Sequence, residues 1–235
     1  MKKSRLIDIS HFSDVLCIWA YLAQIRVDEL KSEFGSHVNL QYHFFPVFGS
    51  VETMMENNWS NLGGLQAYNS HVLKIASSFE HINVHNDIWL KNRPATSISC
   101  HLFLKAIQIL EEMGELPVNN QGEDSANTVF ENMVWELRLA FFRDLKDISN
   151  FNVQIELAEK LGLPVDGIRK NIESGEAYAA MDIDSQLKEK YRVAGSPTFV
   201  FNEGRQIIYG NVGYRVIEAN VKELISQPES QASWC

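Results

Sequence analysis

The sequence predicts an α/β fold in which an all-helical segment interrupts a framework of strands and helices. A strand pattern followed by a helical pattern opens the chain, between residues 5 and 30. A hairpin pattern followed by a helix closes it, between residues 198 and 225, and only helical patterns occupy residues 96–191. With 235 residues, 45% of them hydrophobic, the chain is long enough for one well-filled core or a core plus an inserted subdomain.

A short strand and a long helix are predicted near the N-terminus, and Cys17 lies where one gives way to the other. Leu6, Ile7, Ile9 and Phe12 give the strand pattern, and Trp19, Leu22, Ala23, Val27 and Leu30 recur at helical spacing. Cys17 is therefore expected at or near a helix N-terminus. Unpaired backbone N–H groups and the helix dipole favour a thiolate there, so we expect a reactive cysteine.

The second strand is predicted at residues 38–45, where hydrophobic and polar residues alternate until Pro46. The first helix supplies the right-handed crossover that parallel pairing with an earlier strand requires. Residues 51–95 are less regular. We expect one helix over residues 65–79, preceded by a break at Gly63 and Gly64, and a loop at residues 85–87.

Helices follow one another over the middle of the chain. They are predicted at about residues 96–113, 126–144, 152–161, 165–174 and 177–191, with a loop at 119–125. Phe130, Met133, Val134, Leu137 and Phe141 recur at the helical spacing typical of a core-facing stripe. We interpret the acidic pairs Glu111–Glu112 and Asp182–Asp184 as solvated helix ends rather than acid/base dyads. Cys100, at the opening of the first of these helices, is expected to be buried.

A hairpin and a helix are predicted at the C-terminal end. Residues 198–201 and 206–209 are β-prone, and residues 202–205 carry turn chemistry. Ser196-Pro197 comes directly before this hairpin, where a proline costs no ladder hydrogen bond. The closing helix is expected over residues 214–225.

The order of these elements resembles the thioredoxin superfamily, and in particular its DsbA-like branch of FrnE type. The chain starts with a strand, a thiol and a helix, and it ends with Ser196-Pro197, a hairpin and a helix. Residues 14–21, DVLCIWAY, are similar to the D-x-x-C-P-W-C-Y segment of that branch, and residues 195–199, GSPTF, to its cis-proline loop. Residues 142–149 and 157–163 resemble its inserted helical region. The resemblance implies a thioredoxin-like domain formed by residues 1–95 and 193–227, a helical insertion at 96–192 and a flexible tail at 228–235.

The resemblance also implies roles for individual residues. Cys17 would be the catalytic nucleophile of a thiol-disulfide oxidoreductase, and Trp19 would face the substrate beside it. A cis Pro197 would pack close to Cys17 and leave the backbone of Ser196 open to a peptide or to glutathione. Ala20 stands where the family has its second, resolving cysteine. Cys17 would therefore act through mixed disulfides with glutathione or with protein thiols.

Two alternatives remain open. The same stretch resembles kappa-class glutathione transferases and 2-hydroxychromene-2-carboxylate isomerases, whose motif S-P-[YF]-S-[YW]-L has its catalytic serine at the position of Cys17. In such an enzyme Cys17 would steady a bound glutathione thiolate. Because Ala20 replaces the resolving cysteine, the chain also fits a non-catalytic peptide-binding or chaperone-like module. The third cysteine, Cys235, lies at the end of the polar tail, which is expected to fray.

Composition excludes some classes of function. A net charge of -9 argues against nucleic acid as a partner, and no apolar stretch approaches the ~18 residues of a membrane span. Asp8, His11 and Asp14 interrupt the first apolar run, so no signal peptide is predicted. Three widely spaced cysteines fit a reducing compartment. We therefore predict a cytoplasmic protein with no bound cofactor or metal, glutathione as the candidate co-substrate and a homodimer as the candidate assembly.

Overall fold

The computed structural model describes residues 6–117, 127–226 and 233. The predicted flexible tail lies outside the described residues, except for Ser233, and so does Cys235. Within the described residues, no helix is both long and apolar enough to span a membrane.

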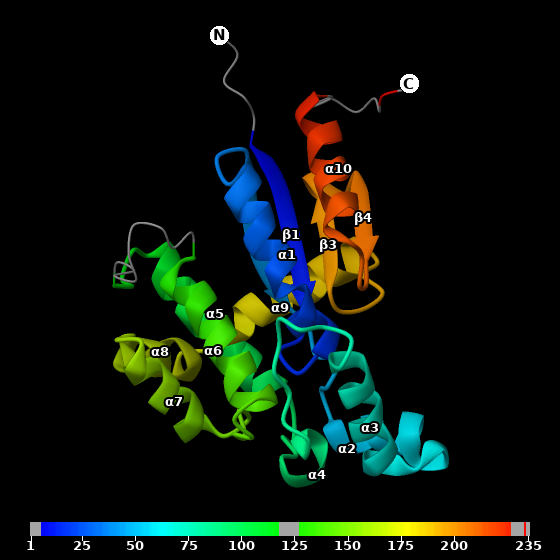
Figure 1. Ribbon diagram of the computed structural model, residues 1–235. Helices are drawn as coiled ribbons and strands as arrows, with labels where there is room; N and C mark the ends of the chain where they lie inside the picture. The colour runs from blue at the N-terminus through cyan, green and yellow to red at the C-terminus, as the bar shows by residue number, and fades with distance from the viewer. Residues whose placement is uncertain (1–5, 118–126, 227–232, 234–235) are drawn as a thin grey trace.

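Four strands form one mixed sheet in the order β2-β1-β3-β4 (Figure 1). β1 (Ile7–Ser13) runs parallel to β2 (Val38–Phe44), and the helix between them is α1 (Ile18–Phe34). β1 also pairs antiparallel with β3 (Thr198–Phe201), and β3 pairs antiparallel with β4 (Gln206–Tyr209). The predicted parallel pair and the predicted hairpin are both confirmed. Strands from the two ends of the sequence are thereby neighbours in the sheet.

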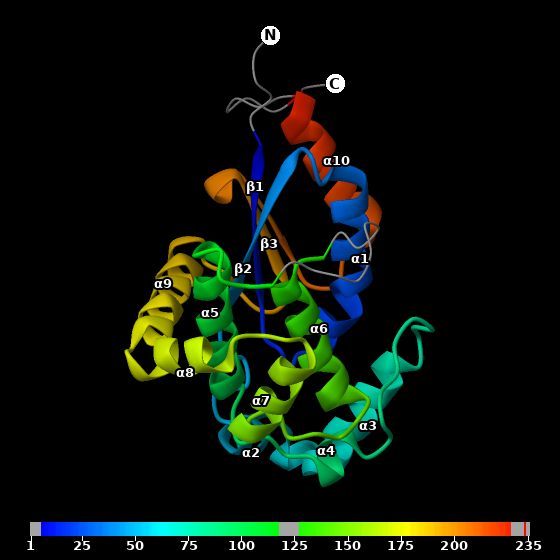
Figure 2. The same cartoon turned by 90° about the vertical axis from the view of Figure 1, so that its left-hand side faces the viewer.

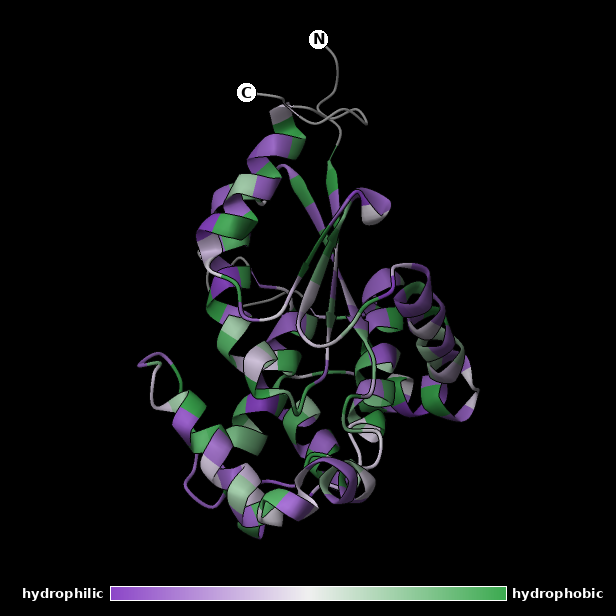
Figure 3. Ribbon diagram, turned by 90° about the vertical axis from the view of Figure 1, so that its right-hand side faces the viewer, coloured by the Kyte–Doolittle hydropathy of each residue, from purple (hydrophilic) through white to green (hydrophobic). Residues whose placement is uncertain are grey.

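Helices cover both faces of this sheet. α1 and α10 (Tyr214–Ser226) lie together on one side, and α9 (Glu176–Lys190) lies on the other, as Figure 2 shows. α10 buries Ile217, Val221 and Leu224, which recur at helical spacing. In Figure 3 the helices around the sheet carry both hydrophobic and hydrophilic residues along their length, as expected of helices that cover a core on one face only.

The middle of the chain is helical, as predicted. Its longer helices are α5 (Ile98–Glu112), α6 (Val129–Phe142), α7 (Phe151–Lys160), α8 (Val165–Glu173) and α9. The predicted stripe on α6 is confirmed, because all five of its side chains are buried. A capping box starts α6: the Thr128 hydroxyl accepts from the Glu131 amide, and the Glu131 carboxylate accepts from the Thr128 amide. The predicted α/β fold with a helical insertion is confirmed.

The region between β2 and α5 holds more helix than the sequence indicates. α2 (Val51–Trp59), a 3-10 turn η1 (Ser60–Leu62) and the short α4 (Ile88–Lys91) accompany the expected α3 (Gly64–Ala76). α2 begins where the Ser50 hydroxyl accepts from the Thr53 amide. Only Val51 and Met55 of α2 are buried, which leaves a hydrophobic stripe too short to be recognised in the sequence.

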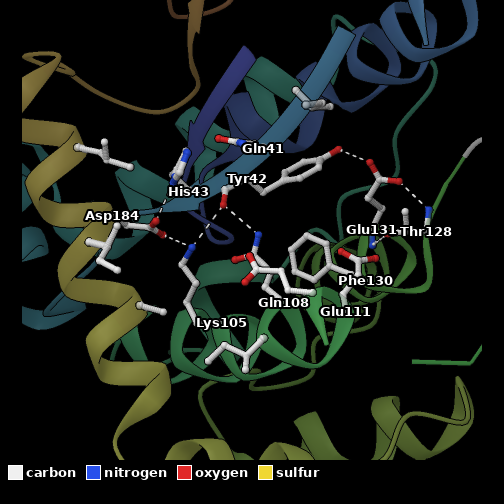
Figure 4. Close-up of a pocket in the computed structure, with 16 residues that line it drawn as sticks. Gln41, Tyr42, His43, Lys105, Gln108, Glu111, Thr128, Phe130, Glu131 and Asp184 are labelled. Atoms are coloured by element: carbon white, nitrogen blue, oxygen red, sulfur yellow. Dashed lines mark hydrogen bonds and ion pairs between the residues drawn. The ribbon is translucent and has the colours of Figure 1, made fainter. Parts of the chain in front are cut away.

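One acidic residue was placed wrongly. Asp184 of α9 is not a solvated helix end: it is 1% exposed and forms an ion pair with Lys105 of α5 at 2.6 Å. Its carboxylate also lies 2.7 Å from His43 Nδ1 and accepts from the Phe44 amide at 2.8 Å, as the close-up in Figure 4 shows in part. Through these contacts Asp184 connects α9 to the end of β2 and to α5. The sequence could not show this because all three partners are distant along the chain.

Candidate functional site

Cys17 lies where β1 ends and α1 begins. It is the N-cap residue of α1, with extended backbone angles and no side-chain capping bond, as the strand-to-helix pattern predicts. Its side chain is turned instead toward the other end of the chain, where the thiol donates to the carbonyl oxygen of Ser196 at 3.4 Å. The residue is 7% exposed. Two segments separated by most of the chain thus meet at this sulfur.

Ser196 and Pro197 form the second part of the site. The peptide bond between them is cis, and Pro197 is followed at once by β3. The Ser196 hydroxyl accepts from the Asp14 amide at 3.0 Å, and the Gly210 amide donates to the Pro197 carbonyl at 2.9 Å. These bonds join the Ser196–Pro197 turn to the end of β1 and to the end of β4. The turn therefore has a fixed position beside Cys17.

Burial opposes ionisation of the Cys17 thiol. Desolvation raises the pKa of Cys17, and the nearby Asp14 carboxylate raises it further. The Ser196 side chain and the amides of Ala20 and Trp19 lower the pKa of Cys17, but by less, so it lies above its ordinary value. This direction is opposite to the expectation that the helix N-terminus favours a thiolate, because the loss of water around a buried sulfur disfavours its charged form.

Asp14, three residues before Cys17, holds the segments around the thiol together. It is fully buried, and its carboxylate accepts from the Leu16 amide at 2.8 Å, the Phe48 amide at 3.0 Å and the Ser97 hydroxyl at 2.7 Å. Its partners belong to the start of α1, the loop after β2 and the start of α5. No structural role for Asp14 was predicted from the sequence, where it appears as part of a motif and as an interruption of the first apolar run. The signal available was an acidic residue inside an otherwise apolar run, which a buried carboxylate with several donors explains.

A cavity of about 500 Å³ opens beside Cys17. It is lined by Cys17, Ile18, Trp19, Phe45, Pro46, Val47, Phe48, Met54, Tyr68, His71, Lys188, Ala194, Gly195, Ser196 and Tyr209. Three residues of the predicted site thus line the same cavity: Cys17, Trp19 and Ser196. Trp19 is partly buried and packs against the core rather than standing fully exposed.

The wall of this cavity carries basic side chains and no acidic ones. His71 and Lys188 are the lining side chains that can carry a positive charge, and no carboxylate is among the lining residues. The Lys188 ammonium lies 5.5 Å from the centre of the Phe45 ring. Tyr68, His71 and Lys188 were not predicted as site residues, because each reaches the cavity from a helix that is remote from Cys17 in the chain. No local motif could have indicated them.

No resolving thiol adjoins Cys17 in the described part of the chain. Ala20 is buried in the first turn of α1, and its amide donates to the Cys17 carbonyl at 3.1 Å. The other described cysteine, Cys100, is free and fully buried in α5, which confirms its predicted burial. Burial raises the pKa of Cys100 strongly, so it is poorly suited to attack a disulfide.

A second cavity, of about 460 Å³, lies against β2 between α5, α6 and α9 (Figure 4). The ion pair of Lys105 and Asp184 forms part of its wall, and the Tyr42 hydroxyl donates to Glu131 at 2.9 Å across another part. It shares no lining residue with the Cys17 cavity. Residues 6–117, 127–226 and 233 contain no group of three His, Cys, Asp or Glu side chains suited to a metal ion, and His81 and His85 do not form one.

A comparison with protein families identifies one family for this chain. A family model described as a DSBA-like thioredoxin domain matches residues 8–222. The ClpXP adapter protein SpxH of Halalkalibacterium halodurans is 22% identical over 238 residues, which cover 98% of this chain and 72% of that protein.

Solved structures show the same fold. The cytosolic disulfide reductase DsbM from Pseudomonas aeruginosa superimposes with a TM-score of 0.63 at 17% identity, covering 92% of this chain and 98% of DsbM. A 2-hydroxychromene-2-carboxylate isomerase gives a TM-score of 0.59 at 16% identity, covering 94% of this chain and 97% of the isomerase.

Proposed function

The chain belongs to the family of DsbA-like thioredoxin domains, and on that premise we propose that it is a thiol-disulfide oxidoreductase that works through a single cysteine, Cys17. One observation carries the proposal. The Cys17 sulfur contacts the Ser196 carbonyl, beside Pro197, and borders a cavity large enough for a small thiol or a peptide segment. Cys17 is then the nucleophile, Trp19 shapes the wall of the cavity, and Ser196 and Pro197 orient the incoming group.

With Ala20 at the position of the resolving cysteine, the reaction proceeds through a mixed disulfide. The Cys17 thiolate attacks one sulfur of a disulfide, a new S–S bond forms, and the other sulfur leaves as a thiolate that takes a proton from water. A second thiol then attacks the substrate sulfur of the mixed disulfide, forms a new disulfide with that sulfur and releases Cys17 as a thiolate. One S–S bond is broken and one is formed in each turnover, so the net reaction is a thiol-disulfide exchange, and no bound cofactor is needed.

Glutathione is the partner that we propose for this cavity. It carries more carboxylate than ammonium charge at neutral pH, and the Lys188 ammonium on the cavity wall is of the complementary sign. The DsbM protein of Pseudomonas aeruginosa has also been solved with GSH, at a TM-score of 0.60 to this chain. Protein thiols are the other partners that the proposal admits.

The remaining sequence predictions join this proposal. We propose a FrnE-type protein of the cytoplasm, formed by residues 1–95 and 193–227 around a helical insertion at residues 96–192. A homodimer is the proposed assembly. Nucleic acid is not a proposed partner, because a net charge of -9 disfavours phosphate backbones.

A second candidate is a glutathione-dependent transferase or isomerase. The raised pKa of Cys17 favours it, because a cysteine that stays protonated is suited to donate a hydrogen bond to a glutathione thiolate. The fold shared with 2-hydroxychromene-2-carboxylate isomerase is compatible with it. A third candidate, a non-catalytic peptide-binding module, has support from the similarity to SpxH, a protein named as an adapter.

The test uses the chain with Cys100→Ser and Cys235→Ser, so that Cys17 is the remaining thiol. Intact-protein mass spectrometry after incubation with glutathione disulfide is expected to show one glutathione added, with none on a further Cys17→Ser variant. No adduct at any pH up to 9.5 would refute the single-cysteine mechanism. Calorimetric binding of reduced glutathione by the Cys17→Ser variant, without an adduct in its parent, would instead favour the second candidate.

A further inference from the structure

Tyr68 of α3 faces the Cys17 cavity with an unused hydrogen-bonding group. The residue lines the cavity and is only 7% exposed. Its hydroxyl has no hydrogen-bond partner among the described residues, and the hydroxyl oxygen itself remains accessible. A tyrosine hydroxyl that borders a cavity and has no protein partner is free to donate a hydrogen bond to a molecule in that cavity.

The surrounding aromatic rings hold Tyr68 in place. Its ring centroid lies 4.9 Å from that of Trp59, 5.2 Å from that of Trp89 and 6.4 Å from that of Phe48. Trp89 is fully buried, so this contact is part of the core. A donor fixed by packing needs little reorganisation when charge develops next to it, which is the condition for efficient electrostatic stabilisation.

Tyr68 and Cys17 line the same cavity, but no hydrogen bond joins their side chains. The Cys17 thiol uses its hydrogen bond on the Ser196 carbonyl, and none joins it to the Tyr68 hydroxyl. Burial raises the pKa of Tyr68, and the charges of Cys17 and Asp14 raise it further, so the hydroxyl stays a donor at every physiological pH. Both residues line the same cavity of about 500 Å³, which is large enough for a small disulfide.

We propose that Tyr68 is a second catalytic residue, which donates a hydrogen bond from its hydroxyl to the sulfur that leaves when Cys17 attacks a disulfide. This inference rests on the proposed function, since it assigns the partner of the same site. As the bond between Cys17 and the first substrate sulfur forms, the bond to the second sulfur breaks and its electron pair stays on that sulfur. The leaving thiolate then carries the negative charge that the Tyr68 hydroxyl stabilises, and water protonates it on release.

The test compares Tyr68→Phe with its parent, both carrying Cys100→Ser and Cys235→Ser. Stopped-flow rates of mixed-disulfide formation are measured with 2-hydroxyethyl disulfide, whose leaving thiolate is basic, and with an aromatic disulfide, whose leaving thiolate is weakly basic. Alkylation by iodoacetamide, which releases iodide, reports on Cys17 alone. We expect Tyr68→Phe to slow the first reaction roughly tenfold, because hydrogen bonds to charged groups are strong, and to slow the second less. The alkylation rate should stay within about twofold.

The outcomes separate the inference from the proposed function. Equal rates for Tyr68→Phe and its parent with 2-hydroxyethyl disulfide, or an equal loss in all three reactions, would overturn the role of Tyr68. A parent that reacts with both disulfides but never with glutathione disulfide would count against glutathione and leave Tyr68 supported. Tyr178→Phe, which removes an exposed hydroxyl on α9, is the matched control and should change none of the rates.

Unfolding of the same variants supplies an independent check. Because the Tyr68 hydroxyl has no partner within the described residues, Tyr68→Phe should leave the melting temperature of the free protein unchanged within about 2 °C. Tyr21→Phe is the contrast: the Tyr21 hydroxyl donates to the Asn83 carbonyl at 3.3 Å, so its removal should lower the melting temperature. A larger loss for Tyr68→Phe than for Tyr21→Phe would mean that the Tyr68 hydroxyl has a structural partner, and it would overturn the inference.

Discussion

Replacing Asp14 by asparagine tests whether the buried carboxylate holds the site together. The carboxylate accepts two backbone amides and the Ser97 hydroxyl, all between 2.7 and 3.0 Å. Asparagine keeps one oxygen and turns an NH₂ group toward donors, so at least one buried N–H loses its acceptor. An unsatisfied buried donor costs about 1–3 kcal/mol, and bonds to a charged acceptor are the stronger ones. We expect Asp14→Asn to lower the free energy of unfolding by about 2–4 kcal/mol at pH 7.

The pH dependence of this loss gives a second, independent number. Burial alone would raise the pKa of Asp14, but His101 and the amides of Phe48 and Leu16 outweigh it, and the pKa lies below its ordinary value. A carboxyl group whose pKa is lowered by folding stabilises the protein above its unfolded pKa of ~3.9, and this stabilisation disappears as the pH falls through the folded pKa. The difference between wild type and Asp14→Asn should therefore be constant from pH 7 to 5 and shrink below about pH 4.

Urea unfolding followed by tryptophan fluorescence at pH 7, 5, 4 and 3 measures both effects. Asp182→Asn is the matched control: Asp182 lies on α9, is exposed and bonds only to Gln186 four residues later. It should change the free energy of unfolding by less than about 0.5 kcal/mol. A loss this small for Asp14→Asn, or a loss that persists unchanged to pH 3, would refute the view that the ionised carboxylate fixes the segments around Cys17.

Three further predictions concern the thiol, the cavity and the buried ion pair. Because burial raises the pKa of Cys17, its alkylation rate should still be rising above pH 9; a plateau below pH 8 would contradict this. Lys188→Gln should slow adduct formation with glutathione disulfide about two- to fivefold, since one partly exposed charge is lost. The same substitution should slow adduct formation with neutral 2-hydroxyethyl disulfide less. Equal effects on the two disulfides would exclude recognition of the glutathione carboxylates by Lys188. Lys105→Met should lower the free energy of unfolding by about 3–5 kcal/mol by leaving Asp184 without its cation, and Lys105→Met with Asp184→Leu should recover much of this loss in urea unfolding.

Local sequence signals predicted the parts of the fold that local chemistry determines. The hairpin strands were predicted at residues 198–201 and 206–209, and β3 and β4 have these bounds, because turn residues 202–205 define both ends. The position of Cys17 at the start of α1 was predicted from the change of hydrophobic period. α2 was missed because its buried face is only two residues wide.

The walls of the site could not be predicted in the same way. Tyr68 reaches the Cys17 cavity from a helix that precedes the proposed insertion, and Lys188 reaches it from the last helix within that insertion. Neither residue belongs to a motif around the thiol. Asp184 was assigned to the solvent because an acidic residue in a polar helix is usually exposed. Its burial depends on Lys105 and the end of β2, and partners at such sequence separations leave no periodic signal.

The burial of Cys17 has opposite consequences for the thiolate that starts the proposed reaction and for the mixed disulfide that it forms. Removing water raises the free energy of the thiolate, which slows attack, but a mixed disulfide carries no charge at the sulfur and does not have this cost. Ala20 removes the neighbouring thiol that would break such a disulfide from within. A buried cysteine with no resolving partner beside it therefore forms its adduct slowly and keeps it until a second thiol enters the cavity. Under this view the groups that accelerate the reaction must come from the cavity wall or from the partner, which is the role proposed for the hydroxyl of Tyr68 and the charge of Lys188.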